Sequence, residues 1–301
     1  MGGARLVTAQ AGGAETDEPL ALRVEGGHPL VAVMPLERAR VGGGPAVRGR
    51  MLDVDLRDDF REAARKRDIP DDVVDWWLQL ARPCLELHRN CDGPVVGYFG
   101  GQPSLPESMD WPDGLVFLAT IDLSMIPAGS HDIALPADGH LLFFTEADIS
   151  PEDARVLYVP AGTPVVERTF PGDAPWEGYE RFALHGICAW SLPSSRTESA
   201  IDIGESRYDE RIFGEIEWGL PGHDDCIGAI GGYSECSTGG GFDIAGSPST
   251  RNVLANLYLD EDSVDPEDFG HVGVVLNYVM ANEDLKARRF DRAWIVSDFN
   301  G

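Results

Sequence analysis

Two histidines that each follow a glycine are the first candidates for chemistry in this sequence. His140 stands in the run DGHLLFF and His271 in the run FGHVGVV, each at the start of a strand-like segment. Asp122 and Asp260 lie at or near the ends of two other strand-like runs. An imidazole titrates near neutral pH, and beside a carboxylate it can act in acid–base catalysis or bind a polar ligand. These four residues form the candidate catalytic set.

A purely structural role for the same histidines is the alternative, and we favour it. A histidine at the edge of a strand can make one hydrogen bond to a turn and do nothing further. Geometry discriminates the two interpretations. An enzyme needs the histidines and the acids to converge in one pocket within hydrogen-bond distance.

Other runs that suggest chemistry are incomplete. Residues 223–226, His-Asp-Asp-Cys, are the densest group of metal-ligating types, but adjacent side chains cannot readily all face one ion. The acidic loop at 260–268 lacks the fixed glycine and closing glutamate of an EF-hand. The glycines at 239–241 lack the Lys-Ser/Thr of a P-loop, and no serine stands in a G-x-S-x-G frame. We interpret these runs as acidic turns and loops.

The cysteines give no metal-binding pattern either. There are five and none form a C-x-x-C pair, which makes a zinc knuckle improbable. They are Cys84, Cys91, Cys188, Cys226 and Cys236. Idle thiols in a reducing compartment are the default interpretation. We therefore predict no metal site and no cofactor.

The charge of the chain limits its partners. With 24 basic and 51 acidic residues, the formal net charge is −27, which repels nucleic acid and anionic membranes and favours a basic protein partner. The acidity can equally serve solubility. No apolar run is long enough to span a membrane, and the first residues do not resemble a secretory signal. We expect a cytoplasmic protein. The excess of arginine over lysine fits a GC-rich genome, and the scarcity of lysine with abundant aspartate also fits a salt-adapted cytoplasm.

Two amphipathic helices are expected before the β-rich part. Residues 52–68 place apolar side chains on one side and a basic face on the other, with Arg57, Arg61, Arg65 and Lys66. That face should pair with carboxylates. A second helix follows Pro70, and Pro83 should stop it, with one further helical turn at residues 84–88.

From residue 95 onward, short β-rich runs alternate with Gly, Pro and Asp turns. This texture predicts an α+β fold dominated by a meander-like antiparallel sheet. We divide the chain into a flexible tail (1–18), N-terminal strands and a linker (19–51), and one domain (52–301). Within the domain we expect helices at 52–90 and two similar β-units at 95–192 and 226–299.

The two β-units are inferred from an internal repeat of three blocks. VGYFGGQP recurs as IGAIGGYS, LVFLATIDL as VLANLYLD, and DGHLLFF as FGHVGVV. Ile121-Asp122 then corresponds to Leu259-Asp260, and Gly139-His140 to Gly270-His271. Such a duplication would pack with approximate twofold symmetry. Chance similarity of short glycine-containing strands stays open as the alternative.

The stretch 95–123 has the character of a rigid scaffold. Gly100 and Gly101 permit backbone angles that other residues avoid, and Trp111 can bury a large ring beside a proline turn. The repeat supplies a second glycine pair, Gly231 and Gly232. We name these five residues as candidates for binding a ligand or a partner.

The same stretch carries a family resemblance. The pattern G-G-x-P-x-L-P from Gly100 to Pro106, then Trp111-Pro112, then Ile121-Asp122-Leu123, then DGHLLFF resembles the YwqG-like family of bacterial proteins. The C-terminal run HVGVVLNYVMANEDLKARRFDRAWIVSDF is also similar to that family, so the resemblance covers residues 52–299. It implies a fold but no settled biochemical activity.

Three functions remain open. The first is a binding module for a basic protein partner, with an immunity or antitoxin role as one version, because proteins resembling the YwqG-like family are sometimes found beside bacterial toxin systems. The second is an enzyme with a site at the interface of the two β-units. The third is a small-molecule sensor. The sequence does not indicate an oligomeric state.

Overall fold

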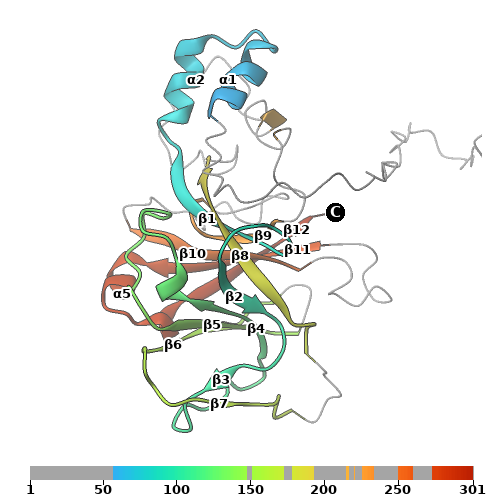
Figure 1. Cartoon of the computed structure of the whole chain (residues 1–301), viewed down its shortest axis with the longest axis vertical. Coiled ribbons are helices and arrows are strands. Elements are labelled where there is room, and N and C mark those ends of the chain that lie inside the picture. Colours follow the sequence, from blue (N-terminus) through green and yellow to red (C-terminus); the bar gives the residue numbers. More distant parts are fainter. Residues whose placement is uncertain are drawn as a thin grey trace, which may run out of the picture. The chain divides into compact units, whose positions relative to one another are not determined.

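A strongly coiled antiparallel sheet carries the fold (Figure 1). The computed structural model describes residues 57–147, 151–172, 178–192, 215–216, 220, 226–233, 250–259 and 273–300. All of them belong to one unit of the chain, Arg48–Gly301. The predicted tail and N-terminal strands at 1–51 lie outside the described residues.

Ten strands of the described chain form this sheet, and every neighbouring pair is antiparallel. In sheet order they are β12 (Trp294–Asn300), β11 (Gly273–Ala281), β10 (Arg251–Leu259), β9 (Cys226–Gly231), β1 (Arg82–His88), β8 (Phe182–Ser191), β2 (Val95–Phe99), β4 (Val116–Asp122), β5 (His140–Thr145) and β6 (Ala154–Val159). The two edge strands, β6 and β12, approach each other, so the sheet is nearly closed into a barrel. The predicted antiparallel, mainly β fold is confirmed.

Alternation of side chains along the strands builds the main core. Leu85 and Leu87 of β1 point to the enclosed face of the sheet, and Leu141 and Phe143 of β5 do the same. Side chains from the other strands join them in one continuous buried cluster. Because successive residues of a strand face opposite sides, the residues between them are left for the outer face. That outer face carries a second apolar cluster and a surface groove.

A second apolar cluster covers part of the outer face. Phe117 of β4 and Phe144 of β5 pack there against the segment that follows β2. Trp111 from that segment sets the edge of its ring against Phe144, with centroids 5.4 Å apart, and its indole N–H donates to the Leu115 carbonyl over 2.7 Å. A short ladder of β3 (Ser104–Leu105) and β7 (Val166–Glu167) borders this cluster.

Helices α1 (Arg57–Arg65) and α2 (Asp71–Leu78) pack through their own small core. The basic face of α1 pairs with internal carboxylates, as predicted: Arg61 Nε lies 3.1 Å from Asp75 and Arg65 Nε lies 3.0 Å from Asp71. These pairs are solvent-exposed, so each contributes at most about 1 kcal/mol. The described residues also contain the helical elements η1 (Leu123–Met125), α5 (Asn282–Lys286) and η3 (Phe290–Arg292). Within the described residues, no helix is long and apolar enough to cross a bilayer.

The prediction of a helical turn at residues 84–88 is wrong, since this segment is strand β1. Helix α2 ends at Leu78, and Pro83 does not favour a further helical turn because it has no N–H to donate and disfavours helix at the residue before it. Beyond it the sequence Cys-Leu-Glu-Leu-His alternates with period two, which is the period of a strand. The alternation sends Leu85 and Leu87 into the core and leaves Glu86 and His88 on the outer face.

Arg82, the first residue of β1, ties distant segments together. Its guanidinium makes two bonds of 2.8 Å to Asp132 and also donates to the Gly232 carbonyl and to the Asn252 side chain. The bidentate pairing fixes the loop before β5 against the centre of the sheet. Beside it, burial lowers the pKa of His131 below its usual 6.5, although Asp132 and a backbone bond to Ile133 oppose the shift.

This shift predicts how stability depends on pH. Since the folded state holds His131 neutral, the unfolded chain takes up a proton at higher pH than the folded chain does. Stability should therefore be intact above about pH 6.5 and should fall as the pH drops below that value. Urea unfolding measured between pH 7.5 and about pH 5 tests this, and His131→Gln should flatten that part of the profile. An unchanged slope in the variant would contradict the assignment to His131.

Close approach between strands requires glycine at two places. A Cβ on Gly97 of β2 would lie 2.1 Å from the Thr120 carbonyl oxygen of β4. A Cβ on Gly228 of β9 would lie 2.0 Å from the Asn256 carbonyl oxygen of β10. Neither distance is tolerable, so each glycine allows its strand to lie against its neighbour.

Gly228→Ala is expected to lower the free energy of unfolding by about 3 kcal/mol, because it adds this clash to the strain of a φ of 150°. Gly162→Ala is the matched control. Its φ is 76° but nothing lies within 4 Å of the new methyl group, so only about 1 kcal/mol of strain is expected. Equal losses in urea unfolding would show that the strand contact is unimportant.

Candidate functional site

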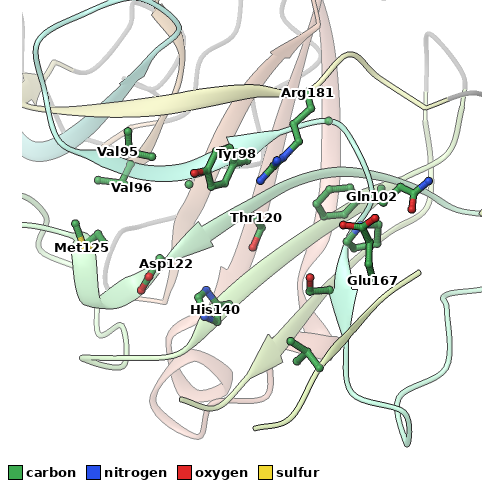
Figure 2. A pocket seen from close by; sticks show the side chains of 16 residues that line it. Val95, Val96, Tyr98, Gln102, Thr120, Asp122, Met125, His140, Glu167 and Arg181 are labelled. Atoms are coloured by element: carbon green, nitrogen blue, oxygen red, sulfur yellow. The ribbon is translucent and has the colours of Figure 1, made fainter. Parts of the chain in front are cut away.

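A groove of about 790 Å³ lies on the outer face of the sheet, over β2, β4 and β5. Figure 2 shows its lining side chains, which come from these strands, from the segment after Gly100, and from the region of β7. Its volume is in the range of ligand pockets, but the groove is open to solvent.

Strand register brings the polar side chains of the groove together. Thr120 and Asp122 alternate along β4 toward the outer face. Tyr98 of β2 is the register partner of Thr120, and His140 of β5 is the register partner of Asp122. Because directly opposed residues of antiparallel strands share a face, these four side chains form one contiguous patch on the floor of the groove.

Asp122 has a structural task in this patch. Its carboxylate accepts a hydrogen bond of 3.0 Å from the Ser124 amide and one of 2.6 Å from the Ser124 hydroxyl. It thereby caps η1, the turn that leaves β4. His140 is exposed beside it, and among the described atoms no hydrogen bond joins its ring to the Asp122 carboxylate. Half of the candidate catalytic set therefore shares one groove without forming an acid–base pair.

The other half of that set, His271 and Asp260, lies outside the described residues. The hypothesis that the four groups converge stays a prediction.

One basic side chain also lines the groove. The Arg181 guanidinium carbon lies 4.1 Å from the centroid of the Tyr98 ring, in cation–π geometry. Arg181 directly precedes β8, and Gly101 leaves room for it, since a Cβ there would lie 2.8 Å from the Arg181 Cδ. Glu167 of β7 and Asp122 supply negative charge in the same groove.

The rim of the groove is apolar and exposed. Among the described residues, seven large apolar side chains are exposed, and five of them line or adjoin this groove. They are Val95, Tyr98, Met125, Val165 and Val166, with 36 to 46% of their surface exposed. Single exposed apolar residues are ordinary on a protein surface, whereas a group of them around one groove calls for an explanation.

The five residues predicted to bind a ligand or a partner do not all lie in the groove. Gly100 lines the groove and turns the chain at a φ of 62°, and Gly101 follows at 75°. Gly231 and Gly232 turn with similar angles but lie by His131 and Ser191, away from the groove. Trp111 packs in the outer apolar cluster rather than in the groove lining. Their proposed binding roles remain predictions.

The sequence reasoning missed the rim of the groove. Met125, Val165 and Val166 drew no attention because isolated apolar residues in turns are common. The signal that could have found Val165 and Val166 is the pair itself, an apolar step just after Pro164 in an otherwise polar segment.

The fold and the groove together define a mainly antiparallel, barrel-like β-protein with an amphipathic surface groove. The family profile described as "Domain of unknown function (DUF1963)" matches residues 98–298, which include most of the sheet and most of the groove lining. The chain belongs to this family. No curated protein matches the sequence significantly.

A stability measurement distinguishes a structural Asp122 from a purely functional one. Asp122→Ala removes both bonds to Ser124 and is expected to cost about 1 kcal/mol. Ser124→Ala removes only the hydroxyl and should cost about half as much. Both values come from urea unfolding. If Asp122→Ala left stability unchanged, the carboxylate would be free for a ligand and the structural interpretation would fail.

Proposed function

We propose that this protein is a binding module whose groove takes a basic, partly apolar segment of a protein partner. The gathering of exposed apolar side chains around the groove is the observation that carries this proposal. Burying such a rim against a partner would supply hydrophobic free energy of about 25 cal/mol for each Å² removed from water. An enzyme that binds a small polar substrate does not need an exposed apolar rim around its site.

Charge supports a basic partner. Asp122 and Glu167 offer carboxylates inside the groove. Beyond the groove, a formal net charge of −27 would attract a cationic protein over distances set by the ionic strength. Arg181, which lies against the Tyr98 ring, cancels one of the two carboxylate charges in the groove, so the groove lining keeps a formal net charge of −1 with histidine counted as neutral.

The immunity or antitoxin version of this function is a narrower proposal. It rests on the resemblance to the YwqG-like family and on the acidity of the chain, as does the proposal of a bacterial, cytoplasmic protein. A groove that binds a basic segment is compatible with it.

A ligand-binding or enzymatic site is the second candidate. Asp122, His140 and Thr120 lie side by side in a groove large enough for a small molecule, which favours a sensor or an acid–base enzyme over a featureless surface. The described lining residues run from Val95 to Arg181, so all of them lie within the first β-unit as predicted from the sequence, residues 95–192. The groove therefore gives no support to a site between two units with those predicted bounds.

We also propose that the sheet arose from two tandem β-units, each of five strands. The first would be β1, β2, β4, β5 and β6, and the second β8, β9, β10, β11 and β12. These units differ from the expected bounds of 95–192 and 226–299, because β1 joins the first unit and β8 joins the second. The strand order supports the duplication, since it reads the same from either end when the units are exchanged. In this arrangement β1 of the first unit pairs with β9 of the second, and β8 of the second unit pairs with β2 of the first. The first strand of each unit is therefore exchanged into the sheet of the other unit.

Irregularities at matching positions support the duplication. Register shifts pass over Val96 in β2 and Ile227 in β9, and again over Leu118 in β4 and Leu254 in β10. The close glycines, Gly97 and Gly228, match in the same way. A shared pattern of bulges is more specific than shared composition, since bulges are retained within families.

The strand registers correct two of the residue correspondences that the internal sequence repeat predicted. Ile121 pairs with Gly97 as Leu257 pairs with Gly228, so Leu257 replaces Leu259 as its counterpart. By the same steps the counterpart of His140 is Val275 rather than His271. The proposed symmetry therefore gives His140 no histidine as its counterpart.

Peptide binding tests the proposed function. Fluorescence anisotropy with peptides that alternate arginine and leucine should detect binding that weakens as salt is added. Peptides that alternate arginine and serine, with the same charge, should bind more weakly. Met125→Ser and Val165→Ser should each reduce affinity by about fivefold, because each removes one apolar contact of about 1 kcal/mol.

Trp294→Ser is the control, since Trp294 is exposed on β12 and is not part of the groove lining. The binding-module proposal fails if the serine peptides bind equally well, or if the control weakens binding as much as the groove variants do. An affinity that does not depend on the apolar side chains of the rim would reflect only the net charge of the chain.

A further inference from the structure

Three side chains with metal-ligating atoms meet on the outer face of the sheet, away from the groove. Glu86 and His88 come from β1 and Cys226 comes from β9. One oxygen, one nitrogen and one sulfur atom from these residues all lie within 4.8 Å of one another. We propose that Glu86, His88 and Cys226 form a binding site for a transition-metal ion, of which Zn²⁺ is the best fit.

The fold builds this cluster by a specific device. Glu86 and His88 are two residues apart on one strand, so they share a face, while Leu85 and Leu87 point into the core. On β9 the register shifts next to Leu87, and the shift places Cys226, rather than Ile227, opposite His88. Bulges of this kind re-aim side chains and are frequent beside functional sites.

The distances suit a small ion. His88 Nε2 lies 3.0 Å from the Glu86 carboxylate. Around tetrahedral Zn²⁺, bond lengths of about 2.0 Å to N or O and 2.3 Å to S put neighbouring ligand atoms roughly 3.3 to 3.6 Å apart. Small side-chain movements within the present cluster would therefore complete the coordination. Three protein ligands leave a fourth position for water.

Charge and burial favour an ion over an empty cluster. The His88 side chain is 5% exposed and the Glu86 side chain 18% exposed, so a carboxylate is held largely away from water. A divalent ion would be balanced by the Glu86 carboxylate and the Cys226 thiolate. The loaded site would be electrically neutral, which avoids the cost of a net charge in a partly buried place.

Ligand type selects the class of metal. Thiolate and imidazole prefer Zn²⁺ and similar transition metals, whereas Ca²⁺ and Mg²⁺ require oxygen ligands. On binding, the Cys226 thiol loses its proton to solvent, and a neutral His88 must carry its proton on Nδ1 so that Nε2 can ligate. Each ion bound to the neutral histidine therefore releases one proton.

Cobalt is the probe for this site. Reduced protein stripped of metal by a chelator is titrated with Co²⁺ in the presence of millimolar Ca²⁺, which occupies acidic surface loops. We expect one Co²⁺ for each chain, near-ultraviolet thiolate-to-metal absorption, visible bands of a tetrahedral site, and displacement by one equivalent of Zn²⁺. If unmodified protein shows no thiolate-to-metal absorption, the proposal is overturned without recourse to any variant.

Variants then locate the ion. Glu86→Gln keeps the shape of the side chain, and Cys226→Ser replaces only the sulfur. Each should weaken Zn²⁺ binding by at least about tenfold, as measured by competition with a chelating dye. Cys188→Ser is the matched control, because Cys188 lies on β8 opposite Leu85 and is not one of the clustered residues. Unchanged affinity in Cys226→Ser, or an equal loss in the Cys188 control, would refute this site.

Discussion

The pairing of β1 with β8 at the centre of the sheet is the constraint on which the rest of the structure depends. The paired residues are 97 to 109 positions apart in the chain, yet seven consecutive pairs join the two strands, from Arg82 with Ser191 to His88 with His185. Beyond this pair the sheet continues through β9, β10, β11 and β12 on one side and through β2, β4, β5 and β6 on the other. Both halves of the nearly closed barrel are therefore held together through one long-range pairing, reinforced by the bonds of Arg82.

Local sequence patterns predicted most of the strands because each carries its own signal. The runs VVGYF and HLLFFT coincide with β2 and β5. The error at residues 84–88 arose because a short segment after a proline was read as a continuation of the preceding helix. Its period-two alternation was present in the sequence, but five residues are few for separating a strand from a helical turn. The near closure of the sheet depends on contacts between β6 and β12, which no local pattern contains.

The candidate sites were harder to predict than the fold, for two physical reasons. Asp122 and His140 could be singled out by residue type and by position at strand ends, but the apolar rim is defined by what the loops leave uncovered. The cluster joins Glu86 and His88 to Cys226, about 140 residues further along the chain, and a register shift decides that Cys226 meets His88. Exposure and register depend on tertiary contacts, so they cannot be predicted from residue spacing alone.

The proposed duplication explains why the two features need not be repeated. The registers make His185 the counterpart of His88, and they make Val95 the counterpart of Cys226. Where the second unit supplies a thiol, the first supplies an exposed valine on the rim of the groove. On these proposals, equivalent backbone positions would contribute to a metal site in one unit and to an apolar binding surface in the other. Binding of a divalent ion with release of one proton would raise the formal net charge by one unit, from −27 to −26, so the charge that attracts a basic partner would be almost unchanged.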